Sequence, residues 1–292
     1  MSKKKKSGLR NKKLKERKKM KGKGLPSLPD PISFEGMLSD MFGDTEEENP
    51  VKKAQDIIYD AWEIATPKRR IELARKALEV SMDCADAYVL LAEEAATSPS
   101  EALDFYRQGV EAGERALGKE AFEEDVGDFW GILETRPYMR ARAGLAQCLW
   151  EVGQREEAVE HYMDMLRLNP NDNQGIRDLL MPCLIELGQD KDAESLFKKY
   201  KEDIMATWAY SRALLEFRRS GDSAEANKAL AAAIRNNRHI PVYLLGRKKM
   251  PNFLPEYCSH GDVNEAMFYV YGNRAAWQAT PGALDWLTAH TK

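Results

Sequence analysis

The stretch LAQCLWEVGQREEAVEHYMDMLRLNP, residues 145–170, decides the fold class. Its apolar residues recur at i, i+3, i+4 and i+7, which is the period of an amphipathic helix. The small residues Ala146 and Ala158 allow two helices to approach closely, and Gly153 between them permits a tight turn. Tyr162 would fill the core of the pair, and the final proline cannot continue the second helix. The stretch therefore predicts two packed antiparallel helices.

The spacing of these residues resembles the tetratricopeptide repeat, a helix pair of about 34 residues. The matching positions are Leu145, Ala146, Leu149, Gly153, Ala158, Tyr162 and Pro170. Weaker copies on both sides predict about five helix pairs over residues 51–238, with an irregular insertion near residues 114–136. The resemblance implies an all-α, right-handed, tetratricopeptide-like helical solenoid.

Residues 239–292 do not continue the repeat, and we expect a C-terminal helical capping module there, because the last pair of a solenoid exposes its core. Its distinctive residues are Pro241, Tyr243, Leu244, Leu245, Pro255, Gly261, Asp262, Glu265, Ala266, Tyr269, Trp277, Gly282, Ala283 and Leu284. These residues resemble the C-terminal end of the family named after suppressor of tumorigenicity 7.

Several helix starts are marked by capping residues. Thr66, Ser98 and Thr280 each precede a proline, which the first helical turn tolerates. Ser98 and Asp262 are each followed three residues later by Glu, the pattern of a capping box. We expect helices to begin at these positions.

The charge is strongly asymmetric along the chain. Residues 1–24 carry eleven Lys and two Arg against one Glu, a net charge of +12, which leaves −15 on the rest of a chain whose total is −3. This segment has almost no large apolar residues, so we expect a disordered basic tail. Residues 25–50 are interpreted as a linker with a short amphipathic segment at 32–42, available to dock on the body or on a partner.

The basic tail is the clearest feature without a structural explanation. Lys clusters neutralise phosphates and release counterions, so the tail is suited to nucleic acid bound without sequence preference. Its lack of aromatic residues disfavours stacking on bases. An acidic protein partner, the acidic body of the chain itself, an anionic lipid surface and no specific role are the alternatives. The basic residues concerned are Lys3, Lys4, Lys5, Lys6, Arg10, Lys12, Lys13, Lys15, Arg17, Lys18 and Lys19.

The composition argues against membrane-spanning, disulfide-bonded and metal-binding classes. Apolar stretches are broken by charge well short of the roughly 20 residues of a spanning helix. The Lys-rich start lacks the apolar core of a secretory signal, so we expect a cytoplasmic protein. Cysteines stand singly, without metal-ligand spacing, and we expect no metal and no cofactor. They are Cys84, Cys148, Cys183 and Cys258.

Catalytic motifs are absent from the sequence. It contains no phosphate-binding glycine loop, nucleophile elbow or metalloprotease helix. His161 lies on a repeat helix, where surface or partner contact is the simpler interpretation. His260 with Asp262 could form an acid–base pair, but Asp262 is better used as a helix cap. We expect that the protein is not an enzyme.

The stacked first helices of the pairs should create a concave face. The repeat phase places seven residues there: Tyr59, Trp62, Arg140, Gln147, Trp150, Trp208 and Arg218. Aromatic and Arg side chains are common anchors for bound peptides. The alternative is that some of these tryptophans pack between repeats or against the N-terminal amphipathic segment.

The leading functional prediction is therefore a scaffold or adaptor that binds a protein or peptide in this groove, with the tail adding electrostatic contacts. The alternative is a nucleic-acid- or ribosome-associated factor tethered through the tail.

Overall fold

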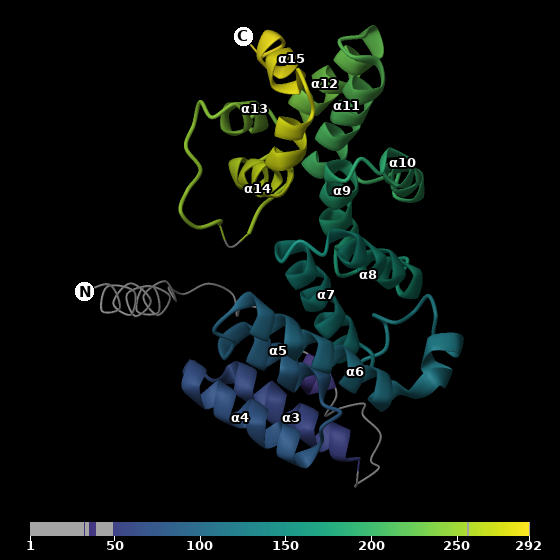
Figure 1. Cartoon of the computed structure of the whole chain (residues 1–292), viewed down its shortest axis with the longest axis vertical. Coiled ribbons are helices and arrows are strands. Elements are labelled where there is room, and N and C mark those ends of the chain that lie inside the picture. Colours follow the sequence, from purple (N-terminus) through teal and green to yellow (C-terminus); the bar gives the residue numbers. More distant parts are fainter. Residues whose placement is uncertain (1–31, 33–34, 39–48, 256, 292) are drawn as a thin grey trace, which may run out of the picture.

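The structure is a computed structural model that describes residues 32, 35–38, 49–255 and 257–291. Within these residues the regular elements are helices, which follow one another in antiparallel pairs along an elongated body (Figure 1). The predicted all-α, tetratricopeptide-like class is confirmed. The basic tail at 1–24 and most of the linker lie outside the described residues.

Five consecutive helix pairs make up the repeat region between residues 50 and 236. They are α3 (Pro50–Glu63) with α4 (Pro67–Val80), α5 (Ala85–Glu94) with α6 (Pro99–Glu124), α7 (Arg136–Glu151) with α8 (Arg155–Leu168), α9 (Ile176–Glu186) with α10 (Asp190–Lys199), and α11 (Ala206–Ser220) with α12 (Ala224–Asn236).

The insertion expected near residues 114–136 is shorter than predicted. Helix α6 continues to Glu124, with a kink at Gly118, whose φ is 71°. The irregular segment is confined to residues 125–135.

Turn chemistry and capping explain where most helices begin and end. Gly153, φ 90°, makes the turn between α7 and α8, a backbone conformation that other residues rarely adopt. Ser98 caps α6 as predicted, its Oγ accepting from the Glu101 backbone N–H at 3.2 Å. The Thr66 hydroxyl makes no such bond, and Thr280 donates instead to the Ala276 carbonyl at the end of the preceding helix. The helix start predicted at Thr66 is confirmed, since α4 begins at Pro67, although the hydroxyl does not cap it. The start predicted at Thr280 is wrong, because α15 begins at Ala283.

Small residues set the helix spacing within and between pairs. Four alanines are fully buried between α3 and α4: Ala54, Ala61, Ala74 and Ala77. On α7, a Cβ built at Gly144 would lie 2.1 Å from the Tyr106 ring of α6. The ring of Tyr106 therefore occupies the space that any side chain at position 144 would need.

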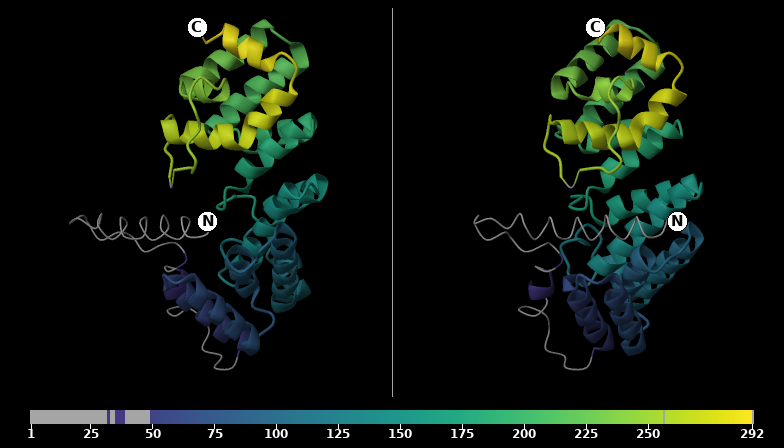
Figure 2. Two further views of the ribbon diagram at one scale, coloured as in Figure 1. Left: turned by 60° about the vertical axis from the view of Figure 1, so that its left-hand side comes forward. Right: turned by 90° about the vertical axis from the view of Figure 1, so that its left-hand side faces the viewer.

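The C-terminal module consists of α13 (Ile240–Leu244), α14 (Val263–Ala279) and α15 (Ala283–Ala289). Helix α14 packs against α9 and α11, the first helices of the last two pairs (Figure 2). On α15, the Trp286 ring stacks on Phe217 with centroids 4.5 Å apart, and its Nε1 donates to the Asn227 side chain. The module thus covers the first-helix side of pairs four and five, beyond the end cap that we expected.

A buried carboxylate fastens this module to the repeats. Glu265 of α14 accepts from the backbone N–H of Ala206 at 2.9 Å, which satisfies the start of α11. It also accepts from the Asn237 side chain and from the Gly261 N–H, each at 2.7 Å. Because all these groups are donors, the carboxylate needs no neighbouring cation.

Asp178 of α9 lies near three other acidic side chains, those of Asp203, Asp172 and Glu265. Burial first, and the nearby Asp203 second, raise the pKa of Asp178 to about 6. The folded chain therefore holds a proton at Asp178 more tightly than the unfolded chain does.

We predict that Gly144→Ala lowers the free energy of unfolding by about 1–3 kcal/mol, because the new methyl group must displace the Tyr106 ring. Urea denaturation measures the change. The combined variant Gly144→Ala/Tyr106→Ala should lose less than the sum of the two single changes. Strict additivity would contradict the proposed clash.

We predict that Asp178→Asn is more stable than the wild type at pH 8 by about 1–2 kcal/mol. Its raised pKa means that Asp178 stabilises the fold at acidic pH and that this contribution is lost as pH rises through about 6. The advantage of the variant should therefore shrink between pH 8 and pH 4.5, as measured by urea denaturation. Asn at the exposed Asp60 is the control, and a pH-independent effect at 178 would contradict the prediction.

Candidate functional site: an arginine clamp on the first helices

The first helices of pairs one to three present polar and aromatic side chains to one another. Residues spaced by four, seven or eleven positions share one face of a helix. These faces carry Gln55, Tyr59 and Trp62 on α3, Asp86 on α5, and Arg136, Arg140 and Gln147 on α7.

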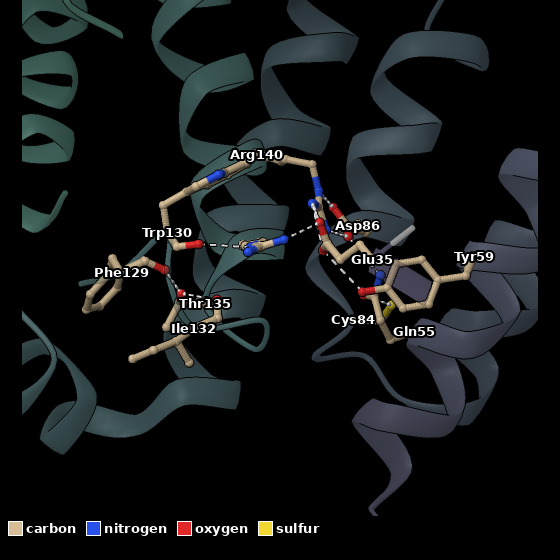
Figure 3. A network of polar contacts seen from close by, with 11 residues as sticks. Glu35, Gln55, Tyr59, Cys84, Asp86, Phe129, Trp130, Ile132, Thr135 and Arg140 are labelled. Carbon is tan, nitrogen blue, oxygen red and sulfur yellow. Dashed lines mark hydrogen bonds and ion pairs between the residues drawn. The ribbon is translucent and has the colours of Figure 1, made fainter. Parts of the chain in front are cut away.

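Asp86 and Arg140 form the buried base of the site (Figure 3). Asp86 is fully buried, and Arg140 reaches it with two nitrogens, Nε at 2.9 Å from Oδ1 and Nη2 against Oδ2. Gln55 donates to the same carboxylate at 2.8 Å. The Arg140 guanidinium also lies over the Trp62 ring, 5.5 Å from its centroid. These contacts fix one edge of the guanidinium.

The other edge of Arg140 faces Glu35, which belongs to the helical residues 35–38 (Figure 3). Nη1 of Arg140 lies 3.0 and 3.1 Å from the two Glu35 oxygens. Arg136 Nη1 donates to Oε2 at 3.3 Å, and the Tyr59 hydroxyl donates to Oε1 at 3.2 Å. The Glu35 side chain is 4% exposed, although 101 residues separate it from Arg136. We call Tyr59, Arg136 and Arg140 the arginine clamp.

Electrostatics keep Arg140 and Tyr59 of the clamp in their donor forms. Burial by itself would lower the pKa of Arg140, but Asp86, with a smaller effect from Glu35, raises it overall. Burial, followed by the charges of Glu35 and Asp86, raises the pKa of the Tyr59 phenol. At neutral pH the site therefore offers two guanidinium groups and one hydroxyl to a carboxylate.

The segment 125–135 orients the second arginine. Arg136 Nε donates to the Trp130 carbonyl at 2.9 Å, and its guanidinium lies 5.4 Å from the centroid of the Trp130 ring. Thr135 holds the turn by donating to the carbonyls of Phe129 and Ile132 (Figure 3). Arg136 thus has fixed contacts that do not involve Glu35.

A cavity of about 420 Å³ adjoins the clamp. It is lined on one side by Gln55 and Tyr59 of α3, and on the other by the end of α6 and the start of α7. Tyr59 therefore belongs to the clamp and also lines this cavity.

The structure brings together three of the seven residues predicted to line the groove, namely Tyr59, Trp62 and Arg140. Gln147 is exposed farther along the same face of α7. Trp150 is half-buried, with the Arg155 guanidinium 4.8 Å from its ring centroid.

The remaining two predicted groove residues have structural contacts. Trp208 is 4% exposed and packs edge-on against Phe197, so the prediction that it lines an open surface is wrong. Arg218 donates to the Ile185 carbonyl at 2.5 Å and pairs with Asp190 at 3.3 Å. It satisfies the end of α9, where helix carbonyls lack partners.

The sequence reasoning missed Glu35, Asp86 and Arg136. Asp86 stands in the otherwise apolar stretch ADAYVLLA, and a charge at such a position requires a buried cation. That pattern could have been noticed. In the segment 32–42 the apolar residues dominate the pattern, and nothing in that pattern distinguishes Glu35 from an exposed charge.

The sequence matches a known protein family over most of its length. The model of the ST7 protein family matches residues 41–291. The chain belongs to the ST7 protein family. The resemblance noted in the C-terminal module therefore extends over the repeat pairs as well, and the matched region contains the whole clamp but not Glu35.

Curated relatives in the family match most of this chain. The suppressor of tumorigenicity 7 protein-like of Gallus gallus is 28% identical, over 83% of this chain and 48% of the relative. The Homo sapiens protein of the same description is 29% identical, over 81% of this chain and 45% of the relative. The ST7 homolog of Drosophila melanogaster is 27% identical, over 81% of this chain and 48% of the relative. The chain spans about half the length of these relatives.

Among solved structures, that of YrrB, described as a TPR protein with an unusual peptide-binding site, aligns with a TM-score of 0.46 and 19% identity. The alignment covers 70% of this chain and 92% of that one.

The histidines considered as catalytic candidates make other contacts in this ST7 family member. Arg142 Nε donates to Nδ1 of His161 at 3.2 Å, and His260 Nε2 lies 3.1 Å from the Asn236 amide. Asp262 caps α14 as predicted, accepting from the Glu265 N–H at 2.7 Å. Within the described residues, no group of three or more potential metal ligands occurs, and no helix is long and apolar enough to cross a membrane. The basic residues between Lys3 and Lys19 lie outside the described part of the chain.

We predict that Arg140→Met lowers the free energy of unfolding by about 3–5 kcal/mol, because it leaves the buried Asp86 without its cation. Tyr59→Phe, which removes a hydroxyl from the same clamp, should cost about 1 kcal/mol. Urea denaturation of the two variants and the wild type measures both effects. Equal losses would contradict the structural role assigned to Arg140.

Proposed function

We propose that this ST7 family member is a non-catalytic scaffold that binds a protein or peptide on the face formed by its first helices. The observation that supports the proposal is the arginine clamp itself. Its two arginines hold the Glu35 side chain, which is far away in the sequence, through charge-assisted hydrogen bonds. The Trp62 ring lies against the Arg140 guanidinium.

The uncovered part of α7 extends the same face. Gln147 lies on the helix face of the clamp arginines, since eleven residues correspond to about three turns. A peptide that enters the clamp could continue along this exposed side chain. Rigid helices on both sides supply a preformed surface, which reduces the entropy cost of binding.

We further propose a cytoplasmic location and no cysteine-based catalysis, and the state of the cysteines supports both. The four thiols are free, as in proteins of reducing compartments. Burial above all raises the pKa of Cys84 and Cys183 to about 12. Both are therefore thiols at neutral pH and poor nucleophiles.

The experiment places a photo-crosslinking amino acid at position 147 of the full chain, and in a matched variant at exposed Glu160 on α8 of the same pair. After irradiation in cells and nuclease treatment, we expect protein adducts at 147 that are absent at 160. Equal adducts at both positions would contradict binding on the first-helix face. Adducts that require both nucleic acid and residues 1–24 would favour the nucleic-acid alternative instead.

A further inference from the structure

The arginine clamp is already occupied by a piece of the chain itself. Of the described residues between 32 and 38, Glu35 is the one that is buried, while Met37 is 56% exposed. Within the described part of this segment, Glu35 therefore supplies the buried carboxylate that contacts the body.

The backbone next to Glu35 is also in close contact with the clamp. A Cβ at Gly36 would lie 3.2 Å from Cγ of Tyr59. A glycine after the glutamate thus lets the chain lie directly against the ring. The occupied site therefore contacts a Glu-Gly pair, with the arginines on the carboxylate and the Tyr59 ring against the glycine.

The two arginines of the clamp have other contacts that hold them in place. Arg140 is fixed by Asp86 and Trp62, and Arg136 by the carbonyl and ring of Trp130. Donors held in place by other contacts are ready for a new acceptor without rearrangement.

The charges around the clamp favour an acceptor that is negatively charged. Two guanidinium groups converge on this place, and Asp86 neutralises only one of them. Without Glu35 an uncompensated positive charge would remain on partly buried arginines, which is unfavourable. A carboxylate restores the balance, whereas a neutral or basic side chain does not.

We propose that Glu35 is an internal latch, and that the clamp binds a partner peptide carrying a Glu-Gly pair, in competition with this latch. The inference rests on the proposed function and names the chemistry of the partner. A tethered latch acts at an effective concentration in the millimolar range. It therefore keeps weak acidic peptides out and yields to a partner that adds contacts beyond the clamp, for example along Gln147.

The test uses the full chain and a synthetic, fluorescently labelled peptide of residues 30–40 as the probe. Glu35→Lys removes the latch, since a cation is repelled by both arginines. Anisotropy titration should show the peptide binding to this variant at least about tenfold more tightly than to the wild type. Glu35→Gln, which preserves side-chain size, should give a smaller change in the same direction.

Three controls identify the chemistry. A peptide with Gln in place of its Glu should lose at least about tenfold in affinity for the Glu35→Lys chain. Adding Arg136→Met to that chain should also weaken binding of the normal peptide. Glu120→Lys, which makes the same charge change at an exposed site on α6, should bind no better than the wild type.

Urea denaturation first verifies that the wild type and Glu35→Lys are both folded. Equal affinity of the two chains for the peptide would then overturn the latch. Equal binding of the Glu and Gln peptides would overturn carboxylate recognition. A wild-type dimer that becomes a monomer on Glu35→Lys would make a second copy the occupant and overturn the partner proposal. Adducts at position 147 without peptide binding would leave the proposed function standing and the latch refuted.

Discussion

The ion pair between Asp86 and Arg140 is the interaction on which the N-terminal half depends. A carboxylate with no exposed surface must be compensated within the protein, and Arg140 does so from the next helix pair, 54 residues away in the chain. Gln55 joins the same carboxylate from α3, so one polar centre connects the first helices of three pairs. The fully buried residues of the first pair are four alanines and Ile58. To this apolar core the polar centre adds hydrogen bonds between helices of different pairs.

A solenoid leaves the faces of its first helices uncovered, and this chain covers much of that surface with its own ends. Residues 35 and 36 lie against α3 and α7, whereas α14 packs on α9 and α11. The N-terminal and C-terminal contacts with the first helices differ in the interactions that hold them. The C-terminal module contributes stacked aromatic rings and a buried, fully bonded Glu265. The described residues of the N-terminal contact contribute the buried Glu35 carboxylate and the Gly36 backbone against Tyr59, and we propose that this contact is the one that exchanges.

The repeats could be predicted because each of their residues has a local reason. Ala146, Gly153 and Ala158 determine helix approach and turn geometry within a single pair, so their spacing alone is informative. The site could be predicted only in part, since helix phase locates Tyr59, Trp62 and Arg140 but says nothing of what covers them. Trp208 shows the limit: a helix phase that fits a groove equally fits a core once Phe197 packs against the ring. Glu35 reaches its partners across more than a hundred residues, and no local pattern encodes such a contact.

The geometry of arginine explains how one residue can serve both stability and recognition. A guanidinium has two edges that donate in fixed directions, whereas a lysine ammonium is a point charge without such directions. In Arg140 one edge is used by Asp86 of the repeats and the other by Glu35 of the distant N-terminal segment. Removing the outer carboxylate leaves the inner pair intact, so the clamp persists as a shaped, positively charged site. The folding energy of the first three pairs thus maintains a binding site that is complementary to a carboxylate whether or not one is bound.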